Sequence, residues 1–393
     1  MKHAAAWIVP MLAVACWSFQ AKADEHMVLV DTIDVGGNGL AVFDISFVDP
    51  KIGLYVLSDR TNASVDFFDP KSDTFIGRVG GFKGVTLVNG VADNALSGPD
   101  GVTIVGDKEV WAGDGDSTVK VIDIATFEVV DKISTGGSFR CDEMSWDSAD
   151  HILAVANNAD TPPFLTLINT DTHQIIKKIV LDGTGGTPDA ENGLEQSQWS
   201  AKTGLFYVSV PQVGPDPSQG GVSVIDPASQ SVVATYPVQD CSPAGLTLGP
   251  DYEALLGCSA SFGTSPTVLT QSLVINLKSG RVVANIPQVG GSDEVWYDSA
   301  TNHYYLAARS DEDNTGKVTP VLGTVDAGSN EWDGNVATST TAHSVAADKK
   351  SHHVFVPIGF TATPASDPTS PCPTKGCIAV YLPSSADYDD GRH

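Results

Sequence analysis

The sequence predicts an all-β fold, a seven-bladed β-propeller that is closed by pairing of its N- and C-terminal strands. Two observations lead to this prediction. Short alternating strand patterns recur roughly every 50 residues, and helical periodicity is almost absent. Each repeat holds about four strand segments, too few to bury its own faces, so neighbouring repeats must stack, as propeller blades do. A two-domain β-sandwich is the structural alternative, but it does not predict an even period.

The repeats share a fixed order of strands. Second strands, rich in aliphatic and aromatic residues, are predicted at 54–57, 109–112, 152–155, 205–208, 254–257, 304–307 and 354–357. Third strands follow, most of them ending in Asp or Asn, at 65–69, 119–123, 165–169, 222–226, 273–276, 322–326 and 378–382. The last repeat supplies three strands, and segment 28–33 has the pattern of the missing fourth. We therefore expect the first and last segments to pair, which removes exposed sheet edges.

The N-terminal residues have the pattern of a processing signal. Lys2 precedes an apolar run at 4–17, and Ala21-Lys22-Ala23 is a small-x-small cleavage site, so residues 1–23 are predicted to be a secretory signal peptide. A lipoprotein-like cleavage pattern that ends at Cys16 is the alternative. The apolar run is shorter than the roughly 20 residues of a transmembrane helix. We expect no membrane insertion, a single propeller over 24–383, an acidic flexible tail over 384–393, and a periplasmic or secreted location.

The charge balance excludes several classes of partner. The chain has 48 Asp and Glu against 22 Lys and Arg, a formal net charge of −26, and loss of residues 1–23 makes it −28. A charge of this sign repels phosphate, so binding of nucleic acid or of an anionic membrane surface is not expected. The 41% hydrophobic residues suffice for a large core. The expected partner is a small-molecule or cationic ligand, and we expect a monomer.

Five cysteines follow residue 23. Cys372 and Cys377 bracket a short loop, and Cys241 and Cys258 flank a predicted hairpin, so both pairs are candidate disulfides of an oxidising compartment. Cys141 is left over. A buried, inert thiol is favoured over a reactive one, because free cysteine is among the most buried residue types.

Alignment of the first strands places one residue of each repeat at the point where the strand enters the central channel. These residues are Asp44, Asp100, Asp142, Glu195, Ala244, Asp293 and His343. Five carboxylates around one axis repel and raise one another's pKa values unless a cation lies among them. We predict a divalent-cation site, formed by all of these residues except Ala244. Carboxylate oxygens suit Ca²⁺, Mg²⁺ or Mn²⁺, and the imidazole leaves room for Zn²⁺ or Fe²⁺. Turn capping by the acids is the alternative.

His343 has two interpretations. It is a metal ligand or a general acid/base paired with Asp293 or Asp44, or it simply hydrogen-bonds to a carboxylate. The adjacent column, Glu143, Gln196 and Glu294, should point the other way unless the strands are bulged. The loops between second and third strands lengthen in the later repeats and emerge at the same end as the acidic column, which favours binding there. Three tryptophans of the first strands are expected to pack between blades: Trp146, Trp199 and Trp296.

Segments 119–130 and 222–233, together with Pro243-Ala244-Gly245-Leu246-Thr247-Leu248, resemble the YVTN-type repeats of YncE-like propellers. The resemblance implies an exported seven-bladed propeller but no agreed activity, since related proteins include lactonases and amine dehydrogenase subunits, and fold likeness does not decide function.

Three functions follow as hypotheses. The first is binding of a metal ion, a small cationic ligand, or both at the channel mouth. The second is a metal-assisted hydrolase or lyase, lactonase-like, in which the cation polarises a carbonyl and His343 or Glu143 moves the proton. The third is a protein-interaction scaffold with an inert channel.

Overall fold

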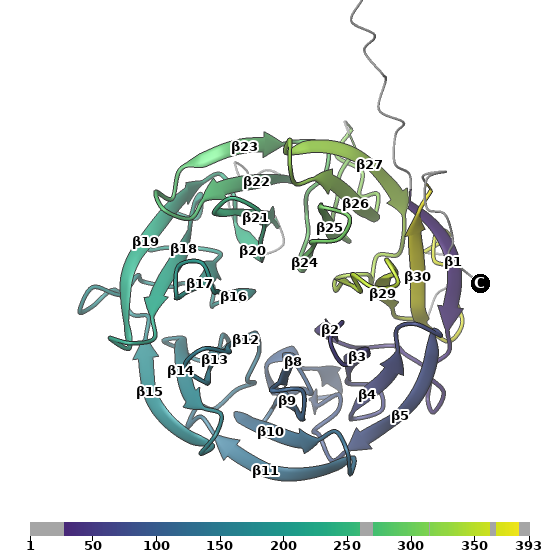
Figure 1. Ribbon diagram of the computed structural model, residues 1–393, viewed down its shortest axis with the longest axis horizontal. Coiled ribbons are helices and arrows are strands. Elements are labelled where there is room, and N and C mark those ends of the chain that lie inside the picture. The colour runs from purple at the N-terminus through teal and green to yellow at the C-terminus, as the bar shows by residue number, and fades with distance from the viewer. Residues whose placement is uncertain (1–26, 260–269, 314, 362–366, 385–393) are drawn as a thin grey trace, which may run out of the picture.

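The computed structural model describes residues 27–259, 270–313, 315–361 and 367–384. The predicted signal peptide and residues 385–393 of the predicted tail lie outside the described residues. Within the described part of the chain, seven four-stranded antiparallel sheets stand like blades around a central axis (Figure 1). The predicted seven-bladed propeller is therefore confirmed.

The blades follow one another along the chain, each running from the innermost strand to the outermost. Blades one to three consist of β2 (Ser46–Asp49), β3 (Leu54–Asp59), β4 (Ser64–Asp69) and β5 (Thr74–Gly80); β8 (Val102–Val105), β9 (Glu109–Asp114), β10 (Thr118–Asp123) and β11 (Glu128–Ser134); and β12 (Met144–Asp147), β13 (Ile152–Asn157), β14 (Phe164–Asn169) and β15 (Gln174–Val180). Blades four to six consist of β16 (Ser197–Ser200), β17 (Leu205–Val210), β18 (Gln219–Asp226) and β19 (Ser231–Gln239); β20 (Pro243–Leu248), β21 (Glu253–Cys258), β22 (Gln271–Asn276) and β23 (Val282–Ile286); and β24 (Val295–Asp298), β25 (His303–Ala308), β26 (Val321–Asp326) and β27 (Glu331–Ala337).

Blade seven is built from both ends of the chain. Its inner strands are β28 (Ala346–Ala347), β29 (Val354–Ile358) and β30 (Cys377–Pro383), and its outer strand is β1 (Met27–Ile33). β1 pairs antiparallel with β30, with Met27 opposite Pro383 and Ile33 opposite Ile378. This pairing confirms the predicted closure of the ring.

The connection from blade one to blade two carries extra elements. A short hairpin of β6 (Leu87–Val88) and β7 (Val91–Ala92) precedes the 3₁₀ helix η1 (Asn94–Leu96). The side chain of Asp93 caps this helix by accepting a hydrogen bond from the backbone N–H of Ala95. Asn94 is thereby held close to the channel.

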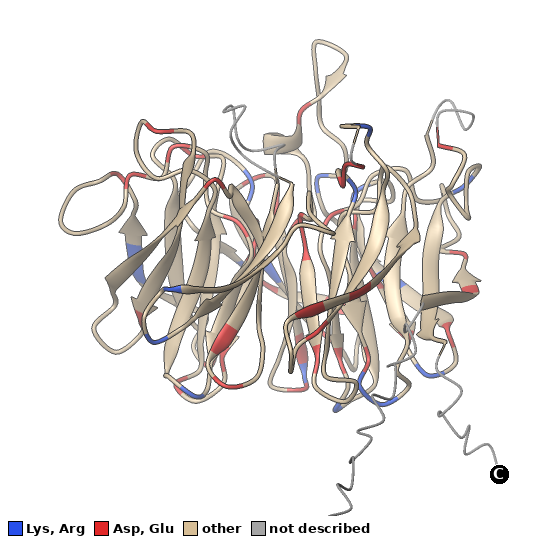
Figure 2. Ribbon diagram, turned by 90° about the horizontal axis from the view of Figure 1, so that it is seen from above, with Lys and Arg blue, Asp and Glu red and all other residues tan. Residues whose placement is uncertain are grey.

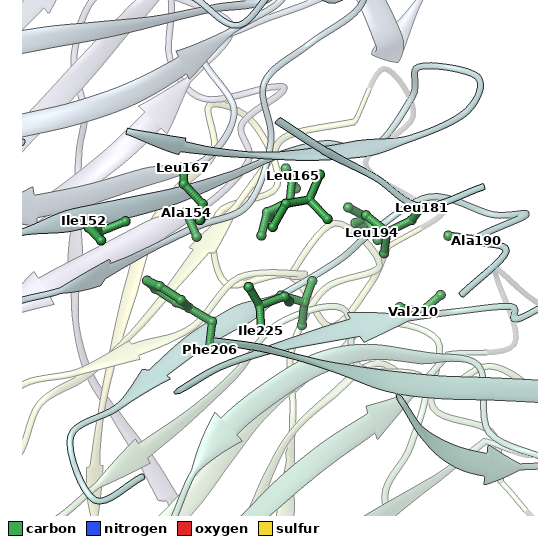
Figure 3. Packing of buried hydrophobic residues seen from close by; sticks show 13 residues of the cluster. Ile152, Ala154, Leu165, Leu167, Leu181, Ala190, Leu194, Phe206, Val210 and Ile225 are labelled. Carbon is green, nitrogen blue, oxygen red and sulfur yellow. The ribbon is translucent and has the colours of Figure 1, made fainter. Parts of the chain in front are cut away.

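The core lies between the blades. Second strands such as β3 and β13 are buried along their whole length, whereas outer strands such as β5 and β15 are largely exposed. Between blades three and four, Leu165 and Leu167 pack against Phe206 and Ile225 (Figure 3). Burial of each such side chain stabilises the fold by roughly 1.5–3 kcal/mol, which explains why stacked neighbours are needed.

Many of the charged residues lie in the loops and at the ends of the strands (Figure 2). Six of the seven third strands end in an Asp or Asn that accepts hydrogen bonds from the following turn. Asp123 accepts from the N–H of Thr126 at 2.8 Å, and Asp226 accepts from that of Ala228 at 3.0 Å. These residues cap turns, the role that Asp commonly has at such positions. None of these strand-end residues lines the two channel cavities.

Both predicted cysteine pairs are disulfide-bonded, Cys241 with Cys258 and Cys372 with Cys377. Cys141 is free and fully buried, as expected, and its burial raises the pKa of the thiol to about 12, which disfavours the reactive thiolate. Among the described residues, no helix has the length and apolar character needed to cross a membrane.

Candidate functional site

In six of the seven blades the column residue stands just before the innermost strand, whereas Ala244 of blade five lies within β20. The backbone N–H of Asp44, Asp100, Asp142 and Glu195 each donates to a carbonyl of the second strand, at Ser58, Gly113, Ala156 and Ser209 respectively, over 2.8–3.0 Å. These bonds extend the first hairpin of these four blades beyond its regular strand. They fix the column residues at one end of the channel.

A cavity of about 320 Å³ lies at this end of the channel. Five of the six predicted ligands line it, namely Asp44, Asp142, Glu195, Asp293 and His343. The sixth, Asp100, is fully buried and does not line the cavity. The structure therefore gathers the predicted residues at one site, which is hollow enough for a small molecule.

Three arginines enter this site, and the sequence interpretation did not assign them a role. The guanidinium of Arg60 bridges Asp44 and Asp100. Nη2 of Arg140 lies 2.6 Å from Asp142, and its Nη1 lies 3.4 Å from Asp44. Nη2 of Arg309 lies 2.8 Å from Asp293. The five carboxylates that the sequence placed in this ring are therefore partly neutralised by the protein's own arginines.

A signal for these arginines exists in the sequence. The whole chain has six arginines, and three of them adjoin repeat positions that face the channel. Arg60 and Arg309 directly follow the second strands β3 and β25, and Arg140 stands two residues before Asp142. Buried carboxylates need counter-charges, so arginine at such positions is physically reasonable.

The arginines divide the carboxylates into two sets. Burial alone would raise the pKa of Asp44, but Arg60, His343 and Arg140 together hold it well below its usual range. Burial raises the pKa of Asp142 to about 6, against the opposing effect of Arg140. Burial also raises the pKa of Asp100 well above its usual range, although Arg60 and Arg140 oppose this. Around Arg60 and Arg140, three carboxylates therefore share two guanidinium groups.

The remaining carboxylates have less compensation. Glu143, Glu195, Asp293 and Glu294 all line the cavity, and Arg309 is paired with Asp293. Burial, together with the charges of Asp142 and Asp293, raises the pKa of Glu195 well above its usual range. This side of the cavity holds a clear excess of acid.

Glu143 and Glu294 line the same cavity as the neighbouring Asp142 and Asp293, so the expected alternation does not hold here. Glu143 and Glu294 stand just before β12 and β24 begin. Side chains alternate between the two faces only within a regular strand, so in the backbone before these strands two consecutive side chains can point into the same cavity. The third member of this column, Gln196, instead accepts hydrogen bonds from the backbone N–H groups of Leu246 and Val295.

A second cavity of about 140 Å³ lies deeper in the channel and also contacts Glu143 and Glu294. Trp146, Trp199 and Trp296 line it, while each also packs against the apolar clusters between blades. The predicted packing role of these tryptophans is confirmed, and they additionally form the wall of the lower channel.

His343 is held by two contacts. Its Nδ1 lies 2.8 Å from the carbonyl oxygen of Thr341, and its ring stacks on Phe43 with the ring centroids 4.4 Å apart. Donation from Nδ1 to this carbonyl leaves Nε2 at 3.6 Å from Oδ1 of Asp44. Of the two predicted partners, the structure places Asp44 beside the imidazole.

The most compact candidate for a metal lies elsewhere. Among the described residues, one group of three side chains, His303, Asp326 and Asp333, has ligand atoms within 4.8 Å of one another and could hold a metal ion. It joins the start of β25, the end of β26 and β27 in blade six. Nε2 of His303 lies 3.0 Å from Asp333, and Asp326 also caps a turn by accepting from the N–H of Gly328. Sequence reasoning missed this group because it assigned such strand-end acids to turns.

The chain matches no protein-family model and no curated protein sequence. Its fold and site define a class of protein, a seven-bladed β-propeller with a mixed arginine and carboxylate cluster at one mouth of the channel.

Proposed function

We propose that this protein is an exported, YncE-like propeller that binds a small organic cation at the channel mouth. The observation that carries the proposal is the excess of carboxylates in the channel. Among the described residues, seven carboxylates meet three arginines there: Asp44, Asp100, Asp142, Glu143, Glu195, Asp293 and Glu294 against Arg60, Arg140 and Arg309. Buried carboxylates without counter-charges are costly, so a cationic ligand would bind favourably.

The spacing of the carboxylates favours an organic cation over a bare metal ion. Oxygen ligands of Ca²⁺ lie about 2.3–2.6 Å from the ion, so they lie within about 5 Å of one another. Within the described residues, the channel carboxylates do not form a set of three that is this compact. An ammonium or guanidinium group instead donates several separate hydrogen bonds and suits the cavity of about 320 Å³.

The proposal gives each part of the site a task. Glu195, Glu143 and Glu294 would accept hydrogen bonds from the cation, and their raised pKa values would fall when it binds. Binding would therefore release protons to the solvent. Arg60 and Arg140 would hold Asp44 and Asp142 in place without competing for the ligand.

Export is supported by two features. Both disulfides suit an oxidising compartment, and residues 1–23 have the pattern of a signal peptide. A periplasmic or secreted location follows as part of the proposal.

Calorimetric titration of residues 24–393 tests the proposed ligand class. We expect cadaverine, putrescine or agmatine to bind, with proton release that changes the measured heat between buffers of different ionisation enthalpy. Glu195→Gln should weaken binding at least tenfold, while Glu331→Gln, an exposed site on β27, should leave it unchanged. Binding of Ca²⁺, Mn²⁺ or Zn²⁺ to the channel, lost in Glu195→Gln, would favour the metal form of the site. If neither amines nor these metals bind, the proposal is wrong.

A further inference from the structure

Arg309 differs from the other two channel arginines in what its guanidinium contacts. Arg60 donates to the carbonyl of Pro99, to Asn94, and to both Asp44 and Asp100. The described residues offer Arg309 a single carboxylate, Asp293, which it contacts through Nη2.

Arg140 resembles Arg60 in this respect. It donates through Nε to Asn158 at 3.2 Å, while Nη1 and Nη2 lie beside Asp44 and Asp142. Nε and Nη1 of Arg309 make no comparable contact within the described part of the chain. Arg309 therefore has donors left for a ligand.

The exposure of the three side chains agrees with this difference. The side chains of Arg60 and Arg140 are 4% and 11% exposed, whereas that of Arg309 is 31% exposed while still lining the cavity. The other two arginines are counter-charges built into the wall. Arg309 is open both to the cavity and to the solvent.

The backbone holds Arg309 in a defined position. It is the first residue after β25, and the N–H of the following Ser310 donates to the carbonyl of Gly291 at 3.3 Å. Asp293 fixes one edge of the guanidinium plane at 2.8 Å. A planar guanidinium held in this way presents its remaining N–H groups in a fork that matches a carboxylate.

We propose that the ligand is a zwitterion, an amine that also carries a carboxylate, as amino acids do. Its cationic group would lie among Glu143, Glu195 and Glu294, and its carboxylate would accept hydrogen bonds from Arg309. This inference rests on the proposed function and extends it, because it names the second charged group of the ligand. Arg309 then acts as the residue that distinguishes amino acids from simple amines.

Pairs of compounds that differ by one carboxylate test the inference. Lysine and cadaverine form one pair, and arginine and agmatine form another. By calorimetry with residues 24–393, we expect the amino acid of at least one pair to bind about tenfold or more tightly than its decarboxylated partner, since hydrogen bonds between charged groups are stronger than those between neutral groups.

Variants then assign the preference to the guanidinium. Arg309→Met should bind both members of a pair equally, and Arg309→Lys should keep part of the preference because a point charge replaces the fork. Arg281→Met, at an exposed arginine beside β23, is the matched control and should keep the full preference. Thermal melting of each variant shows whether it is folded, and Arg309→Lys keeps the test usable if Arg309→Met is not.

The outcomes separate this inference from the function on which it rests. Equal or tighter binding of the decarboxylated amines by the wild-type protein would overturn the zwitterion while leaving the cation site intact. A preference that survives in Arg309→Met would also overturn it. If no member of either pair binds, the proposed function fails with it.

Discussion

Glu143 of blade three and Glu294 of blade six hydrogen-bond to each other across the central channel. Two carboxyl groups can do this when one of them carries a proton. Burial raises the pKa of Glu143 to about 8, and burial together with the charge of Glu143 raises that of Glu294 well above its usual range. The pair lines both channel cavities, so its proton lies between them.

Stability should depend on pH through this pair. The folded protein holds the proton more tightly than the unfolded chain, so the stabilisation is complete below about pH 4.5 and is lost as the pH rises through about 8. In Glu294→Gln the amide donates to Glu143 at any pH. We expect this variant to exceed the wild type by about 1–3 kcal/mol at pH 8.5 and by little at pH 5, measured by urea unfolding. Glu331→Gln is the control, and an equal effect at both pH values would contradict the assignment.

Arg140 should matter more for stability than any exposed arginine. Its removal leaves Asp44 and Asp142 buried with less counter-charge. We expect Arg140→Met to lower the free energy of unfolding by about 3–5 kcal/mol, whereas Arg281→Met changes it by less than about 0.5 kcal/mol. The double variant Arg140→Met/Asp142→Asn should recover part of the loss. No recovery would show that packing of the Arg140 side chain, rather than its charge, is responsible.

The disulfide between Cys241 and Cys258 closes a loop with a sequence separation of 17. Loss of a cross-link over such a loop costs about 3 kcal/mol, because the unfolded chain gains conformational freedom. We expect Cys241→Ala/Cys258→Ala to be destabilised by about this amount in non-reducing urea titrations. The wild type should lose a similar amount in reducing buffer, and identical stability with and without reductant would contradict the prediction.

Cys141 should not react with thiol reagents in the native protein. Because it is fully buried and burial raises its pKa to about 12, a thiol reagent such as Ellman's reagent should not label native residues 24–393. Under non-reducing denaturing conditions, one thiol per chain should react. Labelling of more than one thiol would mean that a disulfide is incomplete, and rapid native labelling would mean that Cys141 is accessible.

The outer strand of blade seven should be required for the ring. A chain that starts at residue 35 lacks β1 and leaves the edge of β30 unpaired. We expect it to lose more than about 3 kcal/mol of stability or to aggregate, as judged by urea unfolding and light scattering. A synthetic peptide of residues 24–34 should restore part of the stability, and a scrambled peptide should not.

The fold was predictable because short strand patterns recur at a regular interval along the sequence. Segments such as 54–57 and 304–307 alternate or run apolar in the way their buried strands require, and segment 28–33 supplied the strand that blade seven lacked. Equivalent repeat positions also located Asp142 and Asp293 at the channel mouth. Because each repeat forms one blade, residues at equivalent positions in the repeats occupy equivalent positions around the propeller axis.

The partners of these acids were not predictable in the same way. Arg60 reaches Asp100, which belongs to the next blade and lies 40 residues away along the chain. This pair depends on the direction of a side chain in the loop that follows a strand, and the repeat pattern does not predict that direction. The compact group of His303, Asp326 and Asp333 was not predicted for a similar reason. Asp333 lies on the outer strand β27, whereas the alignment compared only the residues of the first strands.

Blade seven combines β1 with three strands from the other end of the propeller sequence, and this affects the order in which its strands can pair during synthesis. Along the chain β1 precedes every other described strand and β30 follows them, so β1 stays without its partner until the strands between them have been synthesised. A product of interrupted translation that ends before residue 377 carries two open sheet edges, one on β1 and one on its last strand. Open edges promote pairing between chains, so incomplete copies would tend to be removed by aggregation or proteolysis, and the finished protein is the form in which neither edge is left free.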